Sequence, residues 1–251
     1  MRLDLFLSEK LMVKSRTKAK EMIEKGLVVV NKKTATKPSF DVLEGDIVEI
    51  KEELKYVSKG GEKLEKGIIA FNYGVLDKVF LDVGASNGGF TDCLIKFGAK
   101  KVYAIDVGEN QLEEEIAKNQ KVVVMDKTNA RFLEKENFKE EELFAVSDLS
   151  FISLTLVIPC LSKIVEEMLL LVKPQFECGK KALNKNGIVK SDKDRLDAVL
   201  KVRESLQENG FDIADITIGA SGKEKNTEYV ILAKKGKGIE KQKLIDKFRA
   251  L

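Results

Sequence analysis

The chain contains no histidine and no tryptophan, and its 251 residues include only three prolines and three cysteines. Without histidine it can hold neither a His-based zinc site nor a Ser-His-Asp triad, so hydrolases of that class are excluded. The cysteines, Cys93, Cys160 and Cys178, are far apart and form no C-x-x-C pair. They predict buried thiols in a reducing compartment rather than a disulfide framework or a metal site.

Long apolar runs are also missing. The run at residues 168–172 is far shorter than the ~20 residues needed to cross a bilayer. Charged residues (Asp4, Glu9 and Lys10) interrupt the N-terminal region, so no signal peptide is predicted. With 43% hydrophobic and 34% charged residues, the composition is that of a globular protein. We therefore expect a cytoplasmic protein with no membrane segment and no metal.

Positive charge is concentrated near the N-terminus. Residues 1–37 contain ten Lys and Arg against four Asp and Glu, and the first 60 residues together hold the whole net charge of +3. A basic module beside a neutral body favours a polyanionic partner such as nucleic acid. A lysine-bearing solvated surface would give the same excess, and charge alone leaves both interpretations open.

The most informative pattern lies between residues 79 and 106. An apolar run at 79–83 is followed by a loop with Gly84, Gly88 and Gly89, a helical segment, and a second apolar run that ends on Asp106. Glycines allow a backbone to approach a ligand closely, and a carboxylate at the end of the next strand can bind ribose hydroxyls. The segment therefore predicts a nucleoside site, although an ordinary glycine-containing turn between strand and helix would look similar.

Several nucleotide and nucleophile motifs can be compared with this loop. Ser86 replaces the second glycine of G-x-G-x-x-G, and Phe90, which precedes Thr91, stands where a Walker loop requires lysine. The G-x-S-x-G pattern at residues 84–88 would need a histidine base, which the chain lacks. The remaining form, D-x-G-x-x-x-G, resembles motif I of the S-adenosylmethionine-dependent methyltransferases.

Strand-like runs recur through the rest of the chain and alternate with helical segments. We expect a doubly wound α/β domain with a mainly parallel sheet, whose ligands bind outside the carboxyl ends of the strands. Acidic residues and one lysine fall at or just past these ends: Asp82, Asp106, Asp126, Asp148 and Lys173. The predicted strands are 79–82, 102–106, 122–125, 144–148, 169–172, 212–218 and 228–233, with a helix at 192–209.

The first 50 residues form a pattern of their own. Leu3, Leu7 and Leu11 have helical spacing, Ser15 is suited to cap a second helix that Gly26 ends, and a strand at 27–30 precedes a turn. Together with R-L-D-x-x-L, K-P-S and G-D, this order resembles the S4 RNA-binding domain, a small α+β module. The resemblance implies phosphate contacts from basic residues. The candidates are Lys14, Arg16, Lys18, Lys20, Lys32 and Lys33.

The body carries a series of longer motifs. They are Y-V-S-K-G-G-E-K-L from residue 56, D-V-G-A-S-N-G-G-F-T-D-C-L from 82, D-L-S-F-I-S-L from 148, L-V-K-P-Q-F-E from 171 and N-T-E-Y from 226. This series resembles the TlyA, or hemolysin A, family of ribosomal RNA 2′-O-methyltransferases, with Asn87 departing from the more usual Thr or Ser. The resemblance implies a Rossmann-like, FtsJ-like methyltransferase domain that binds S-adenosylmethionine and acts on ribosomal RNA or ribosomal subunits at cytidine. It implies an S4-like domain at 1–50, a linker at 51–62, a methyltransferase domain at 63–235 and a lysine-rich tail at 236–251. From its composition, this tail is expected to be either a helix or a frayed end.

The family's Lys-Asp-Lys-Glu catalytic set carries over onto Lys63, Asp148, Lys173 and Glu228. In a chain without histidine a lysine is a natural base, and Lys173 is assigned to the ribose hydroxyl. Asp148 and Glu228 would orient and tune it, and Lys63 would position the ribose. The implied cofactor-binding residues are Asp82, Gly84, Ser86, Gly88, Asp106 and Asp126.

Two other classes of function stay open at this level. A non-catalytic RNA-binding or ribosome-assembly protein could keep the same fold, although the catalytic set argues against it. A membrane-active hemolysin is the other class, and the absence of spanning or long amphipathic segments argues against it.

Overall fold

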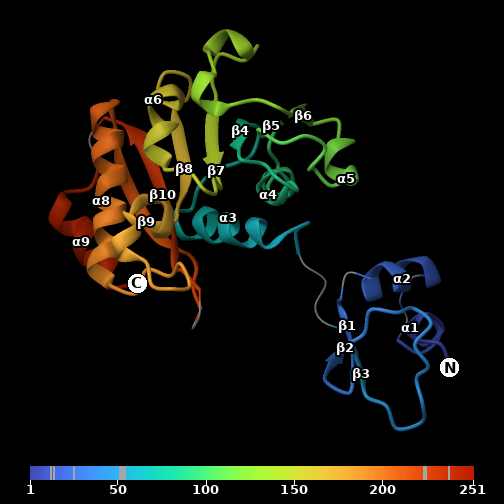
Figure 1. Ribbon diagram of the computed structural model, residues 1–251. Coiled ribbons are helices and arrows are strands. Elements are labelled where there is room, and N and C mark those ends of the chain that lie inside the picture. Colours follow the sequence, from blue (N-terminus) through green and yellow to red (C-terminus); the bar gives the residue numbers. More distant parts are fainter. Residues whose placement is uncertain (12, 14, 25, 51–54, 223–224, 237) are drawn as a thin grey trace. The chain divides into compact units, whose positions relative to one another are not determined.

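The computed structural model describes the chain except residues 12, 14, 25, 51–54, 223–224 and 237. It divides into two compact units, Met1–Leu54 and Lys55–Leu251 (Figure 1). The predicted linker at 51–62 spans this boundary, and its residues 51–54 lie outside the described part.

The N-terminal unit has two helices and a small sheet. Helices α1 (Leu3–Lys10) and α2 (Arg16–Glu24) pack over antiparallel strands in the order β2 (Lys33–Thr34), β1 (Val28–Val30), β3 (Val48–Ile50). The backbone N–H of Lys18 donates to Ser15 Oγ at 3.1 Å, which confirms the predicted cap. Gly26 has a φ of 70°, a conformation that ends the helix at little cost for glycine.

The C-terminal unit is built on a seven-stranded sheet in the order β6-β5-β4-β7-β8-β10-β9. The pairings from β6 to β8 are parallel, whereas β10 runs antiparallel to both β8 and β9. This confirms the predicted mainly parallel α/β sheet. The strands are β4 (Val79–Val83), β5 (Lys101–Ile105), β6 (Val122–Met125), β7 (Phe144–Ser147), β8 (Glu167–Val172), β9 (Phe211–Ala220) and β10 (Glu228–Lys235).

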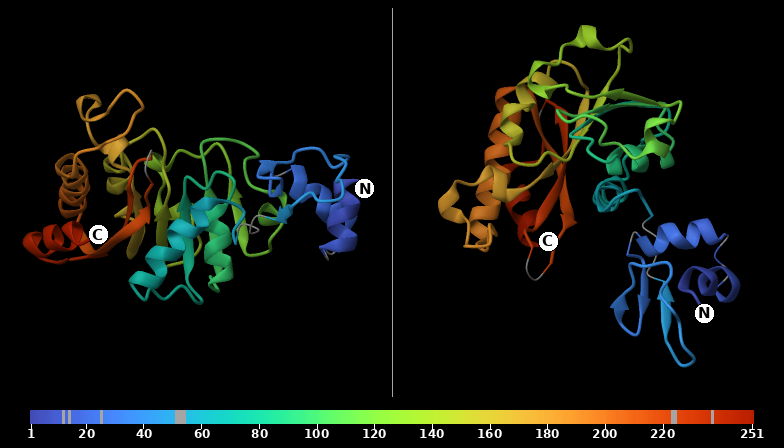
Figure 2. Two further views of the ribbon diagram at one scale, coloured as in Figure 1. Left: turned by 90° about the horizontal axis from the view of Figure 1, so that it is seen from below. Right: turned by 45° about the vertical axis from the view of Figure 1, so that its right-hand side comes forward.

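Helices cover both faces of this sheet (Figure 2). The helices are α3 (Lys59–Ala70), α4 (Gly89–Lys96), α5 (Glu114–Ala117), α6 (Ile158–Leu161), α7 (Pro174–Glu177), α8 (Asp192–Glu208) and α9 (Lys241–Arg249). Leu64 of α3 and Phe90 of α4 pack with Phe80 on one face. Val202 of α8 and Phe248 of α9 share the other core with Leu81. Neighbouring residues of β4 thus face opposite cores, as expected for a doubly wound sheet.

Part of the predicted linker is helical, and the predicted tail contains a helix, one of the two alternatives that the sequence left open. Residues 59–62, assigned to the linker, form the first turn of α3, which Ser58 caps through the N–H of Gly60 at 3.2 Å. Glycines, poor helix formers, obscured this helix. They permit close packing, since a Cβ on Gly67 would lie 2.5 Å from the Val230 side chain. The predicted tail contains α9, whose Phe248 ring packs 4.9 Å from that of Tyr229.

The length and hydropathy of the helices decide whether any of them could span a bilayer. Within the part of the chain that the structure describes, no helix is long and apolar enough to cross a membrane.

Candidate functional site

The loop after β4 is shaped by residues with left-handed backbone conformations. Gly84, Ser86 and Gly88 have φ values of 86°, 48° and 93°. A Cβ on Gly84 would lie 3.1 Å from the carbonyl oxygen of Asp148, and Gly88 is the N-cap of α4. The loop therefore brings backbone N–H groups and the start of α4 to the carboxyl end of the sheet, where a ligand's polar groups can be bound.

Two carboxylates follow the neighbouring strands. Asp106, after β5, accepts hydrogen bonds from the N–H of Ser86 at 2.9 Å and of Gly108 at 2.8 Å, so its carboxylate is fixed against the loop. Asp126, after β6, accepts one from the N–H of Asn110 at 2.9 Å. Since β4, β5 and β6 are adjacent and parallel, the loop and both carboxylates lie along one edge of the sheet. That arrangement suits the sugar and base of a nucleoside.

Asp82 occupies a different environment from the other predicted cofactor residues. It is fully buried in β4, and Oδ2 accepts a hydrogen bond from Thr91 Oγ1 at 2.6 Å. Burial, with Thr91 opposing and the Asp148 and Asp106 charges adding to it, raises the pKa of Asp82 to about 7. The contact joins β4 to α4 beneath the loop, so the structure shows Asp82 as a support of the loop, and direct contact with a cofactor stays a prediction.

The four predicted catalytic residues come together at the same edge of the sheet. Lys173 Nζ, just after β8, lies 2.6 Å from Asp148 Oδ1, just after β7. Lys63 Nζ, on α3, lies 3.8 Å from Asp148 Oδ2 and 2.8 Å from Oε2 of Glu228, the first residue of β10. Cations and carboxylates therefore alternate along the cluster, and Lys173 is almost fully buried.

A cavity of about 250 Å³ joins the loop to this cluster. Its lining includes the loop residues 84–87 on one side and Lys63, Asp148 and Lys173 on the other. A group bound at the loop and a second group bound at Lys173 would therefore meet in one cavity. Such a site can transfer a small group between two ligands.

Sequence reasoning missed three residues that shape this site. Ser150 Oγ accepts a hydrogen bond from Lys173 Nζ at 2.8 Å. Glu177 is buried and accepts hydrogen bonds from the Ser153 hydroxyl and from the N–H of Leu154. Burial raises the pKa of its carboxyl. Phe151 is 88% exposed, has a φ of 69° and packs 5.4 Å from the ring of Phe176. The D-L-S-F motif contains Ser150 and Phe151, and the K-P-Q-F-E motif contains Glu177. Their membership in these motifs was therefore the signal that could have identified them.

The predicted RNA-binding residues form a mixed set in the N-terminal unit. Lys20, Lys32 and Lys33 are exposed, whereas Lys18 is half-buried and lies 3.8 Å from Glu21. Arg16 Nε instead donates to Asp4 Oδ2 at 2.9 Å. The guanidinium groups of Arg2 and Arg16 lower the pKa of the buried Asp4 to about 2. Arg16 thus also stabilises the unit itself, and Lys14 lies outside the described residues.

Comparison with known proteins agrees with this geometry. The sequence pattern of the FtsJ-like methyltransferase family matches residues 56–235, and that of the S4 domain matches residues 1–48. Hemolysin A of Brachyspira hyodysenteriae is 39% identical over 235 residues, which cover 92% of this chain and 98% of that protein. The 16S/23S rRNA (cytidine-2′-O)-methyltransferase TlyA of Mycobacterium tuberculosis is 36% identical over 92% of this chain and 88% of its own length.

A solved structure extends the likeness to three dimensions. A protein from Streptococcus thermophilus, described as a candidate hemolysin, superposes with a TM-score of 0.73 at 34% identity, over 100% of this chain and 96% of that one. The sequence patterns, the relatives and the fold therefore agree on both units. The chain carries an S4 domain at residues 1–48 and belongs to the FtsJ-like methyltransferases, in the TlyA/hemolysin A family.

Proposed function

We propose that this protein transfers a methyl group from S-adenosylmethionine to the ribose 2′-hydroxyl of a cytidine in ribosomal RNA. The observation that carries the proposal is the cavity lined both by the loop at residues 84–87 and by Lys63, Asp148 and Lys173. The close backbone approach at Gly84 and the fixed carboxylate of Asp106 fit the cofactor. Bound there, the cofactor would supply an electrophilic methyl carbon.

The residues of the cluster accept the proton, balance its charge and position the ribose. In its neutral form Lys173 accepts the proton of the 2′-hydroxyl, which is a poor nucleophile until that proton leaves. The ammonium group formed is then balanced by Asp148 Oδ1 at 2.6 Å. Lys63, held by Glu228, places a positive charge at the other Asp148 oxygen and positions the ribose. Proton transfer thus occurs beside a carboxylate that is already paired.

Recognition of the RNA involves both units. The exposed lysines of the N-terminal unit supply phosphate contacts, which carry affinity without reading sequence. Phe151 offers an exposed ring directly after Ser150, whose hydroxyl contacts Lys173, and unstacked RNA bases bind to such rings. The target nucleotide would therefore be held by its base at Phe151 while its ribose reaches Lys173.

The test is mapping of 2′-O-methyl groups on ribosomal RNA by mass spectrometry, after incubation with the protein and S-adenosylmethionine. New methylated cytidines are expected, and the Lys173→Ala variant serves as the matched control. If the RNA gains no methyl group and calorimetry detects no binding of S-adenosylmethionine, the protein is instead a non-catalytic RNA-binding member of its family.

A further inference from the structure

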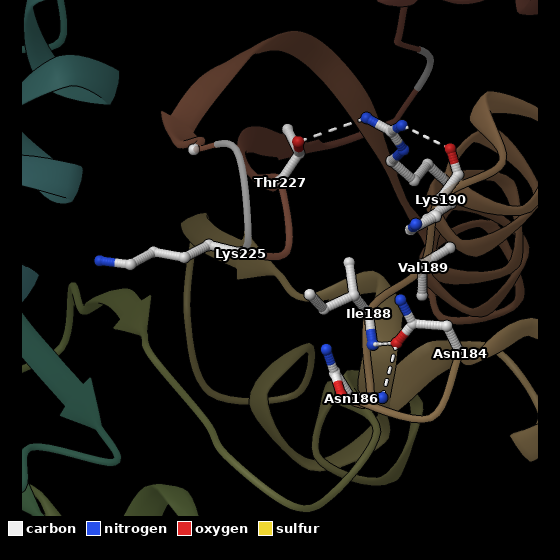
Figure 3. A pocket seen from close by; sticks show the side chains of 9 residues that line it. Asn184, Asn186, Ile188, Val189, Lys190, Lys225 and Thr227 are labelled. Carbon is white, nitrogen blue, oxygen red and sulfur yellow. Dashed lines mark hydrogen bonds between the residues drawn. The ribbon is translucent and has the colours of Figure 1, made fainter.

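A second pocket, of about 410 Å³, lies at the start of β10 (Figure 3). Residues between 184 and 190, in the connection from α7 to α8, form one wall, and Gly222, Lys225 and Thr227, which precede β10, line another. The size falls within the ~300–1,000 Å³ of small-ligand pockets. The described lining residues are Asn184, Asn186, Ile188, Val189, Lys190, Arg195, Gly222, Lys225 and Thr227.

Hydrogen bonds hold the walls of this pocket together. The Asn226 amide accepts from the N–H of Val189 at 2.8 Å and donates to the carbonyl of Gly187 at 2.9 Å. The Arg195 guanidinium donates to the carbonyl of Lys190 at 2.7 Å and to Thr227 Oγ1 at 3.3 Å. The pocket is therefore formed before any ligand arrives, which lowers the entropic cost of binding.

The polar groups of the lining are suited to bind a phosphate group together with the edge of a nucleobase. Its charged members are three cations, Lys190, Arg195 and Lys225, and no carboxylate occurs among the described lining residues. Asp192, which pairs with Arg195 at 3.1 Å, is 86% exposed and contributes little inside the pocket. Arg195 Nε is buried and makes no hydrogen bond within the described structure. Cations select phosphate, and the amides of Asn184 and Asn186 can hydrogen-bond a base edge.

The pocket adjoins the catalytic cluster through the backbone. Thr227 lines the pocket, and the next residue, Glu228, contacts Lys63 at 2.8 Å. Successive Cα atoms are about 3.8 Å apart. Tyr229 of β10 also pairs with Val172 of β8, so Thr227 lies near the end of β8 that precedes Lys173, and RNA whose ribose lies at Lys173 would have this pocket nearby.

We propose that this pocket binds the phosphate and base of a nucleotide adjoining the methylated one. The inference rests on the proposed function and deepens it, because it assigns part of the RNA recognition to the methyltransferase unit. Lys190 and Lys225 contact the phosphodiester, and the 184–190 segment borders the base.

The test compares the full-length Lys190→Ala/Lys225→Ala variant with the wild type. The control is Lys241→Ala/Lys243→Ala, which removes the same charge from exposed positions on α9. Binding to protein-free ribosomal RNA is measured over a series of salt concentrations. Each lost phosphate contact should flatten the slope of log affinity against log salt by about 0.7–0.9, and the KM for RNA should rise several-fold while kcat and S-adenosylmethionine affinity stay near wild type.

The outcomes separate the two proposals. A pocket variant whose salt slope and RNA KM equal those of the α9 control overturns the pocket, while wild-type methylation still supports the proposed function. If the pocket variant shows the expected flatter slope but the wild-type protein transfers no methyl group, the proposed function is overturned. The pocket is then still supported as an RNA-binding site.

Discussion

Lys63 Nζ, on α3, lies 2.8 Å from Oε2 of Glu228, on β10. These elements come from opposite ends of the methyltransferase unit's sequence, and their contact brings both into the site. Lys63 also approaches Asp148, whose other oxygen pairs with Lys173. Removing Asp148 would take from Lys173 its carboxylate, and removing Lys63 would take from Glu228 its cation, and a largely buried charge that loses its partner is costly in a protein interior. The cluster therefore acts as one unit, and variants must be chosen to separate chemistry from folding.

Replacing Lys173 tests the proposed base. Lys173→Ala should lower the rate of methyl transfer at least ~10²-fold, the usual scale of general-base catalysis. Lys173→Arg should not restore the rate, because a guanidinium does not release its proton near neutral pH. Single-turnover methylation measures the rate, with cofactor affinity by calorimetry as the control for folding. Substantial methylation by the arginine variant would remove Lys173 from this role.

Asp106 tests the placement of the cofactor. Losing a hydrogen bond to a charged group costs ~1.5–3 kcal/mol, so Asp106→Ala should weaken S-adenosylmethionine binding roughly ten- to a hundred-fold. Calorimetry measures the affinity, and Asp246→Ala on α9 is the matched control because it removes a carboxylate from an exposed position. Equal affinity for wild type and Asp106→Ala would place the cofactor elsewhere.

Asp82 should make the stability of the protein depend on pH. Its pKa of about 7 lies above the usual ~3.9, so between these values the folded chain holds a proton that the unfolded chain has released. The free energy of unfolding should therefore fall as pH rises from about 4 to 7, by up to about 4 kcal/mol. Asp82→Asn is neutral at every pH and can still accept the Thr91 hydrogen bond, so it should lack this dependence.

Urea unfolding at pH 5 and pH 8 measures the effect. The wild type should lose more stability between the two values than Asp82→Asn, and the exposed-site control Asp246→Asn should behave as the wild type. Identical pH dependence in all three proteins would mean that Asp82 is ionised throughout this range.

The N-terminal unit should supply much of the RNA affinity. Replacing Lys18, Lys20, Lys32 and Lys33 by glutamine keeps the Arg16–Asp4 pair intact and removes one half-buried and three exposed charges. If three or four of them contact phosphates, the salt slope of RNA binding should flatten by about 2 to 3. The measurement is an RNA titration at several salt concentrations. S-adenosylmethionine affinity should not change, and an unchanged slope would make these lysines a solvated surface.

Much of the fold follows from the sequence because buried strands leave strong apolar runs. Each predicted strand of the sheet is present, with ends shifted by at most two residues, and residues 122–125 match β6. The placement of β10 between β8 and β9 could not be predicted, because strand order depends on contacts between distant segments. Helix α3 was missed in part because its glycines, which have low helix propensity, serve packing.

The site was predictable where its residues end strands. Asp106, Asp148 and Lys173 meet because parallel strands bring their carboxyl ends to one edge. Motif resemblance alone indicated Lys63, which lies on a helix. The burial of Asp82 and the Arg16–Asp4 pair depend on side-chain packing, which a single sequence does not show.

The position of β10 also bears on how the protein matures during translation. Strand β9 is synthesised first but has no neighbour in the sheet until residues 228–235 emerge, and β8 remains an open apolar edge until then. The same strand delivers Glu228 to Lys63. A nascent chain can therefore form its glycine loop early, yet it gains a complete catalytic cluster only after residues 228–235 have been synthesised.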